Sequence, residues 1–222
     1  MNDNVIYMEG VFLKQELLRF KDAYSVQFKG FLDFYGRLSF HLIALNNFKD
    51  FSDRINIQNS VELQSLRKDL TNKLECIKYI RHRICGHLDW DFVEQAIKWD
   101  PMLLIDYRES DSKEKSHAFI ADMFAKSVIE CAINSFQKDN PSNKVFHGEF
   151  DMAYTPNYKE FASFIEYTNE KAILFLNLLI ELRMSSIHFY DNLYDALPAL
   201  KDAGQMEFGT KKKPTNKVSD NL

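Results

Sequence analysis

The sequence predicts an all-α protein, a helical bundle of four or more long helices with short accessory helices. Apolar residues recur three and four positions apart along most of the chain, which is the spacing of one buried helix face. The 222 residues include only 7 glycines and 5 prolines, too few for the many turns of an all-β fold. A chain of this length fits a single domain with a sizeable core, which we assign to residues 1–203. Residues 204–222 are polar, and we expect a disordered C-terminal tail there.

The N-terminal half predicts two long helical regions. Apolar spacing over residues 12–48 indicates one long helix or two collinear helices, and Gly30 and Gly36 favour a kink or break near them. Asn59 and Glu62 resemble a capping box that opens the next long helix. Gly86 is suited to close that helix, because glycine tolerates the left-handed conformation of a helix end.

The C-terminal half predicts a short helix and two long ones. Capping-box pairs mark the start of the first two of these helices. Asp91 with Glu94 opens a short helix through Lys98, and Asp111 with Glu114 opens a third long helix. Pro101 interrupts the chain between them, Pro141 ends the third long helix, and residues 142–155 are expected to be irregular, over one end of the bundle. A fourth long helix starts at Pro156–Asn157 and continues, bent, to Leu197, before Pro198.

Composition indicates the cellular setting. Three cysteines, Cys76, Cys85 and Cys131, are an odd number without a Cys-x-x-Cys pair, which argues against a disulfide framework and a zinc site and favours a reducing cytoplasm. The N-terminus lacks the pattern of a signal peptide, and the longest apolar-rich run, 172–180, is too short to span a bilayer, so we expect no membrane association. A net charge of -4 gives no overall attraction to nucleic acid, so RNA binding would need a local basic patch.

One segment carries the strongest functional pattern, the end of the second long helix at residues 80–89. Arg81 falls on the apolar stripe, four residues after Ile77 and three before Ile84. A guanidinium there needs a partner carboxylate, a wet cleft or an anionic ligand, because burying an unpaired charge is costly. His87 follows just past the expected helix end.

Arg81, His82 and His87 resemble the signature of the HEPN superfamily, an arginine, often a polar residue, and then a histidine four to six residues beyond the arginine. Gly86 and Asp89 also resemble what prokaryotic members often carry around this histidine. The resemblance implies an all-helical toxin or phage-defence protein that cleaves RNA without a metal or cofactor. It makes His87 the acid/base, makes Arg81 the group that holds the scissile phosphate, and leaves His82, Arg83 and Asp89 to support them. It also implies a homodimer, an RNA substrate, and an antitoxin or other protein partner.

A second arginine and histidine with this type of spacing, Arg183 and His188, is set aside. No helix-breaking residue separates them, and residues five apart on a continuous helix point about 140° apart. For Arg81 and His87, Gly86 removes that objection.

Other functional interpretations remain open. The main alternative is a non-catalytic helical interaction or nucleotide-binding module, in which Arg81 pairs with a buried carboxylate. A metal-binding bundle would need carboxylates around His41 or around the Glu114-x-x-His117 half-motif, and only one copy of that motif occurs. Lys211–Lys213 are more typical of solvated charge than of an RNA or membrane contact, and Cys85 is typical of a small buried apolar residue.

Overall fold

The structure is a computed structural model that describes residues 2–24, 28–85, 90–104, 113–143, 145–146, 148–187 and 189. Residues 1–186 form one compact unit. Six α-helices and two short 3₁₀ helices, with no strand, make up the described part, which confirms the all-α bundle. The expected tail, 204–222, lies outside the described residues. None of the described helices is both long enough and apolar enough to cross a membrane.

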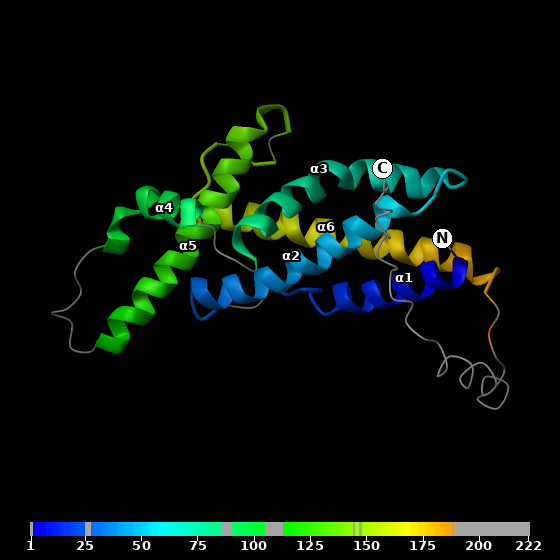
Figure 1. Cartoon of the computed structure of the whole chain (residues 1–222), viewed down its shortest axis with the longest axis horizontal. Coiled ribbons are helices and arrows are strands. Elements are labelled where there is room, and N and C mark those ends of the chain that lie inside the picture. The colour runs from blue at the N-terminus through cyan, green and yellow to red at the C-terminus, as the bar shows by residue number, and fades with distance from the viewer. Residues whose placement is uncertain are drawn as a thin grey trace, which may run out of the picture. The chain divides into compact units, whose positions relative to one another are not determined.

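The long helices lie side by side in the compact unit, and α5 crosses them steeply (Figure 1). Helix α1 packs on α6 and α2, α2 packs on α3 and α5, and α3 packs on α5 and α6. The short α4 packs on α5. The bounds are α1 Asp3–Leu18, α2 Phe31–Arg54, α3 Val61–Ile84, α4 Trp90–Trp99, η1 Pro101–Leu104, α5 Lys113–Asp139, η2 Pro141–Asn143 and α6 Thr155–Met184.

The first helical region is a hairpin, so the expectation of one long helix or two collinear helices was wrong. The rings of Phe20 and His41 stack with their centroids 4.5 Å apart, and the Tyr24 hydroxyl lies 2.9 Å from Nδ1 of His41. On a continuous helix these residues would be at least 25 Å apart, about 1.5 Å per residue. The chain therefore reverses between α1 and α2. A break near Gly30, the N-cap of α2, was correctly expected, whereas Gly36 lies inside α2, which continues through it.

Helix α3 starts one residue later than the expected capping box. Ser60 is its N-cap, and the Ser60 hydroxyl accepts the Leu63 N–H at 3.3 Å. Asn59 precedes the cap, and Glu62 lies in the first turn, where a carboxylate favours the positive end of the helix dipole. The helix ends at Ile84, close to the expected end, whereas Gly86 itself lies outside the described residues.

The remaining helix starts also differ slightly from expectation. Helix α4 begins at Trp90, so Asp91 is inside its first turn and is not its N-cap. The described part of α5 begins at Lys113, and Asp111 lies outside the described residues. Pro101 starts a 3₁₀ helix, and α5 ends before Pro141 as expected.

Helix α6 ends earlier than the apolar pattern suggested. It starts at Thr155 with Pro156 in its first turn, and it ends at Met184, where the chain turns at Ser185–Ser186. The helix was expected to continue to Leu197, and this was wrong for the residues directly after Met184, which form a turn. Residues 190–197 lie outside the described residues.

Aromatic side chains from several parts of the chain fill the core. Seven of the largest fully buried side chains are phenylalanines: Phe34, Phe48, Phe51, Phe92, Phe150, Phe161 and Phe175. Removing a side chain of this size from water contributes about 1.5–3 kcal/mol. Phe150 belongs to the segment between η2 and α6, which is irregular as expected and still contributes to the core.

Candidate functional site

The end of α3 is fixed to α2 by hydrogen bonds. The Tyr35 hydroxyl donates to the Ile84 carbonyl, and the Cys85 thiol lies 3.5 Å from the Ser39 carbonyl. The Cys85 N–H donates to the Arg81 carbonyl at 2.9 Å and closes the last turn of the helix. These contacts hold the backbone that carries the expected Arg-x-x-x-x-x-His motif.

Arg81 lies at the edge of the buried stripe and not at its centre. Ile80 takes the core position and is fully buried beside Ile77 and Ile84, whereas Arg81 is half-buried. Its Nη1 lies 3.4 Å from Nδ1 of His82, and its Nε is shielded from solvent without a hydrogen-bond partner. Within the described part of the chain, no carboxylate lies within 4.0 Å of the Arg81 guanidinium.

Arg83 points away from Arg81, because residues two apart on a helix differ by about 200°. Its guanidinium lies over the rings of Tyr79 and Phe92, at 4.9 Å and 5.8 Å from their centroids. The Tyr79 hydroxyl in turn donates to Asp139 of α5 at 2.6 Å. Arg83 therefore joins α3 to α4 through its contact with Phe92, and it packs on Tyr79, whose hydroxyl links α3 to α5. This is a structural role.

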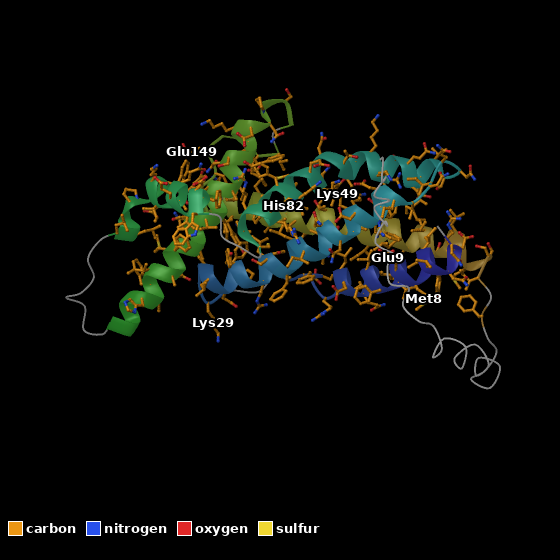
Figure 2. All side chains as sticks on the ribbon, viewed as in Figure 1. Met8, Glu9, Lys29, Lys49, His82 and Glu149 are labelled. Atoms are coloured by element: carbon orange, nitrogen blue, oxygen red, sulfur yellow. The ribbon has the colours of Figure 1, made fainter. Side chains whose placement is uncertain are left out.

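His82 is exposed on the last turn of α3 (Figure 2). Arg81, His82 and Arg83 make this turn basic, which suits the negative end of the helix dipole. His87 and Asp89, the other two residues of the expected site, lie outside the described residues. The structure thus brings Arg81 and His82 together and separates Arg83 from them.

The second arginine–histidine pair was set aside for a reason that the structure contradicts. Helix α6 ends at Met184, so Arg183 and the residues after it are not on a continuous helix. Arg183 nevertheless has a structural environment, because its Nη1 lies 3.1 Å from Asp3 and its Nη2 donates to the Asn56 carbonyl at 3.3 Å. His188 lies outside the described residues.

His41 is a buried histidine with both ring nitrogens hydrogen-bonded. The Tyr24 hydroxyl donates to Nδ1, and Nε2–H donates to Oδ1 of Asn169 at 3.0 Å. Burial lowers the pKa of His41 to about 4, so the ring is neutral at pH 7. Among the described residues, no group of three or more His, Cys, Asp or Glu side chains could hold a metal ion. His117 is exposed on α5, and the side chain of Glu114 is not among those described.

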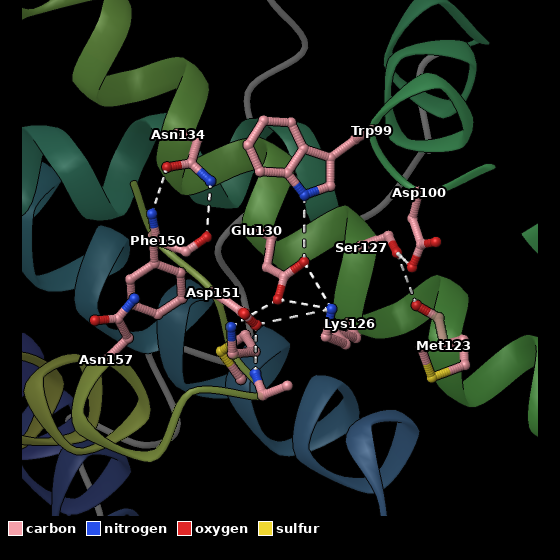
Figure 3. A network of polar contacts seen from close by, with 12 residues as sticks. Trp99, Asp100, Met123, Lys126, Ser127, Glu130, Asn134, Phe150, Asp151 and Asn157 are labelled. Carbon is pink, nitrogen blue, oxygen red and sulfur yellow. Dashed lines mark hydrogen bonds and ion pairs between the residues drawn. The ribbon is translucent and has the colours of Figure 1, made fainter. Parts of the chain in front are cut away.

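A polar network that the sequence reasoning missed surrounds Glu130 on α5 (Figure 3). Its carboxylate accepts the Met152 N–H at 2.6 Å and the Trp99 indole N–H at 3.3 Å, and Lys126 Nζ lies 3.0 Å away. Burial raises the pKa of Glu130, which is only 2% exposed. Asp151 lies at the rim, with Oδ1 3.9 Å from Lys126 Nζ. A cleft of about 760 Å³ opens beside this group.

The Glu130 network has the character of a structural anchor. Both carboxylate oxygens already have donors, so the group ties α4, α5 and the segment before α6 together. The available signal in the sequence was a line of polar residues on α5 at helical spacing, Lys126, Glu130, Asn134 and Gln137, between apolar residues that are buried.

The chain was compared with protein-family models, with curated proteins and with solved structures, and it matches none of them. The resemblance to the HEPN superfamily therefore depends on the motif residues at the end of α3.

Proposed function

We propose that this protein is a HEPN-like, metal-independent endoribonuclease of a toxin or phage-defence system, acting in the cytoplasm as a homodimer. The observation that carries the proposal is the environment of Arg81. It is a half-buried guanidinium in a basic helix end, next to an exposed histidine, and no described carboxylate neutralises it. A guanidinium with no carboxylate partner among the described residues suits a phosphate group.

The proposed reaction is an internal transesterification of RNA. His87 takes the proton of a ribose 2′-hydroxyl, the 2′-oxygen attacks the adjacent phosphorus, and the bond from phosphorus to the 5′-oxygen breaks. His87 returns this proton to the 5′-oxygen, and the products are a 2′,3′-cyclic phosphate and a 5′-hydroxyl. Arg81 stabilises the charge that develops on the phosphate oxygens, and His82 and Asp89 orient the pair.

The alternative, a non-catalytic interaction module, has its own supporting observation. Helix α1 exposes Val5, Met8 and Phe12, which are 50%, 64% and 61% exposed and lie on one face at a three-four spacing. A face of this kind suits a protein partner, and it needs neither Arg81 nor His87.

The test is RNA cleavage by purified wild-type protein in EDTA, with fragments analysed for 2′,3′-cyclic phosphate ends. We expect His87→Ala and Arg81→Ala to abolish the fragments. His117→Ala, at an exposed histidine far along the chain, is the matched control and should cleave like wild type. If folded wild-type protein gives no cyclic-phosphate ends, or if His87→Ala cleaves normally, the proposal is wrong and the interaction module is favoured.

A further inference from the structure

The solvent face of α2 changes character halfway along the helix. In the first half it carries Leu32, Gly36 and Phe40, which we call the α2 stripe, and in the second half the polar residues Asn47, Asp50 and Arg54. Leu32 is 50% exposed and Phe40 is 70% exposed. An exposed line of apolar residues beside a polar continuation is typical of an interaction surface.

Gly36 forms a hollow in the middle of the α2 stripe. Leu32, Gly36 and Phe40 are four residues apart and therefore follow one another on the same side of the helix. A Cβ atom built on Gly36 would meet no atom within 4 Å. The large apolar side chains of Leu32 and Phe40 thus lie on either side of Gly36, which has no side chain and has open space in front of it.

We propose that the α2 stripe is the contact surface between two copies of this chain, whose α2 helices pack antiparallel with Gly36 of each copy at the two-fold axis. The pattern is self-complementary, because an antiparallel pair places Leu32 of one copy opposite Phe40 of the other. Glycine at the crossing lets the two backbones approach closely. The dimer was expected only from the family resemblance, whereas this surface follows from α2 and does not depend on ribonuclease activity.

The charges beside the α2 stripe fit the same arrangement. Asp33 and Arg37 lie along one flank, with Arg37 Nε 3.7 Å from Asp33 Oδ1, and both side chains are more than a third exposed. The two-fold axis keeps this flank on the same side in both copies and reverses the helix direction. Arg37 of one copy then lies within two residues, about 3 Å along the axis, of Asp33 in the other. Each arginine therefore gains a second carboxylate across the interface.

Cysteine cross-linking tests the position of the axis. Gly36→Cys should form a disulfide-linked dimer under mild oxidation, because a residue at the two-fold axis faces its own copy at a distance that a disulfide can span. Met8→Cys, on the exposed face of α1 (Figure 2), is the matched control and should run as a monomer on a denaturing, non-reducing gel, as should wild type. Equal cross-linking at both positions, or none at Gly36→Cys, would overturn the proposal.

Charge reversal tests the orientation independently of cysteine chemistry. Arg37→Asp places four carboxylates along the shared flank, at positions 33 and 37 of both copies. The dissociation constant of the dimer, measured by sedimentation equilibrium, should rise about tenfold or more. Adding Asp33→Arg reverses both charges, restores the complementary pattern and should return the dissociation constant close to that of wild type. Circular dichroism checks that each variant is folded. A wild-type protein that is monomeric at all concentrations, or a double variant as weak as Arg37→Asp, contradicts the proposed surface whatever the outcome of the RNA assay.

Discussion

The side-chain amide of Asn134 forms two hydrogen bonds with the backbone of Phe150: Nδ2 donates to the Phe150 carbonyl at 2.9 Å, and Oδ1 accepts the Phe150 N–H at 2.8 Å (Figure 3). The neighbouring turns of α5 continue this pattern. Gln137 donates to the Gly148 carbonyl, and Glu130 accepts the Met152 N–H. Side chains three and four positions apart on α5 thus hydrogen-bond to alternate residues of the segment before α6. The side chains of α5 satisfy this backbone as a neighbouring strand would.

Replacing Asn134 by alanine should destabilise the protein by about 2–3 kcal/mol, because two backbone groups of Phe150 lose their partners. Urea unfolding, monitored by circular dichroism, measures the change in the free energy of unfolding. Asn140→Ala is the matched control, since the Asn140 side chain donates only to the carbonyl of Phe136, one turn earlier, and it should cost well under half as much. Equal losses in the two variants would show that the pairing with Phe150 contributes nothing special.

Glu130→Gln should cost about 1–3 kcal/mol, because the amide keeps one acceptor and places its NH₂ group against the donors of Trp99 and Lys126. We expect the loss of order to concentrate in the segment before α6, where Met152 depends on this carboxylate. Hydrogen exchange at the Met152 amide should therefore accelerate more than exchange at the amides of α1. Uniform acceleration across the chain would rule out a local anchor.

Two glycines of α2 should respond in opposite directions to alanine. A Cβ on Gly30 would be 3.0 Å from Cγ of Asp122 and closer still to Oδ1, the atom that accepts the Leu32 N–H at 2.8 Å. Gly30→Ala should therefore displace Asp122 and lower stability by about 1–3 kcal/mol. Gly36→Ala meets open space inside a helix and should raise the stability of dilute protein by about 0.5–1 kcal/mol. Thermal unfolding of the two variants gives the comparison, and a shift in the same direction would contradict it.

The buried His41 should make stability depend on pH. Its pKa falls from the ordinary 6.5 to about 4 in the folded protein, so the unfolded chain binds a proton that the folded chain excludes between these values. The contribution is fully present above pH 6.5 and is lost as the pH falls toward 4, about 3 kcal/mol in total. The difference in unfolding free energy between wild type and His41→Gln should shrink across this window. His117→Gln, at an exposed histidine, should leave the pH dependence unchanged.

Arg81 and Arg183 should differ in their importance for stability. Arg81 has no described carboxylate partner, and Arg81→Ala should cost about 0.5 kcal/mol or less. Arg183 pairs with Asp3 and donates to Asn56, so Arg183→Ala should cost about 1 kcal/mol by loosening α1 from α6. A small loss at Arg81 in thermal unfolding would also show that any loss of RNA cleavage in this variant is not caused by unfolding.

The apolar spacing by itself determined that the chain is an all-α bundle, and single residues determined several of its boundaries. Gly30 marked the start of α2, and Pro141 and Pro156 marked the end of α5 and the start of α6. These features depend on backbone conformation and local hydrogen bonding, which a few consecutive residues are enough to fix. The position of Arg81 in the last turn of a long helix was also correctly predicted.

Tertiary structure determined how the helices are arranged and which residues meet, which the apolar spacing of the sequence does not predict. The reversal between α1 and α2 depends on the contact of Phe20 and Tyr24 with His41, and periodicity is the same for a hairpin as for collinear helices. Ile80, and not Arg81, lies at the centre of the buried stripe, because the position of the neighbouring helices determines which of two adjacent residues is buried. The Glu130 and Asn134 contacts join α5 to residues 16 to 22 positions away. Such pairings depend on which segments the fold brings together, and local sequence does not encode that choice.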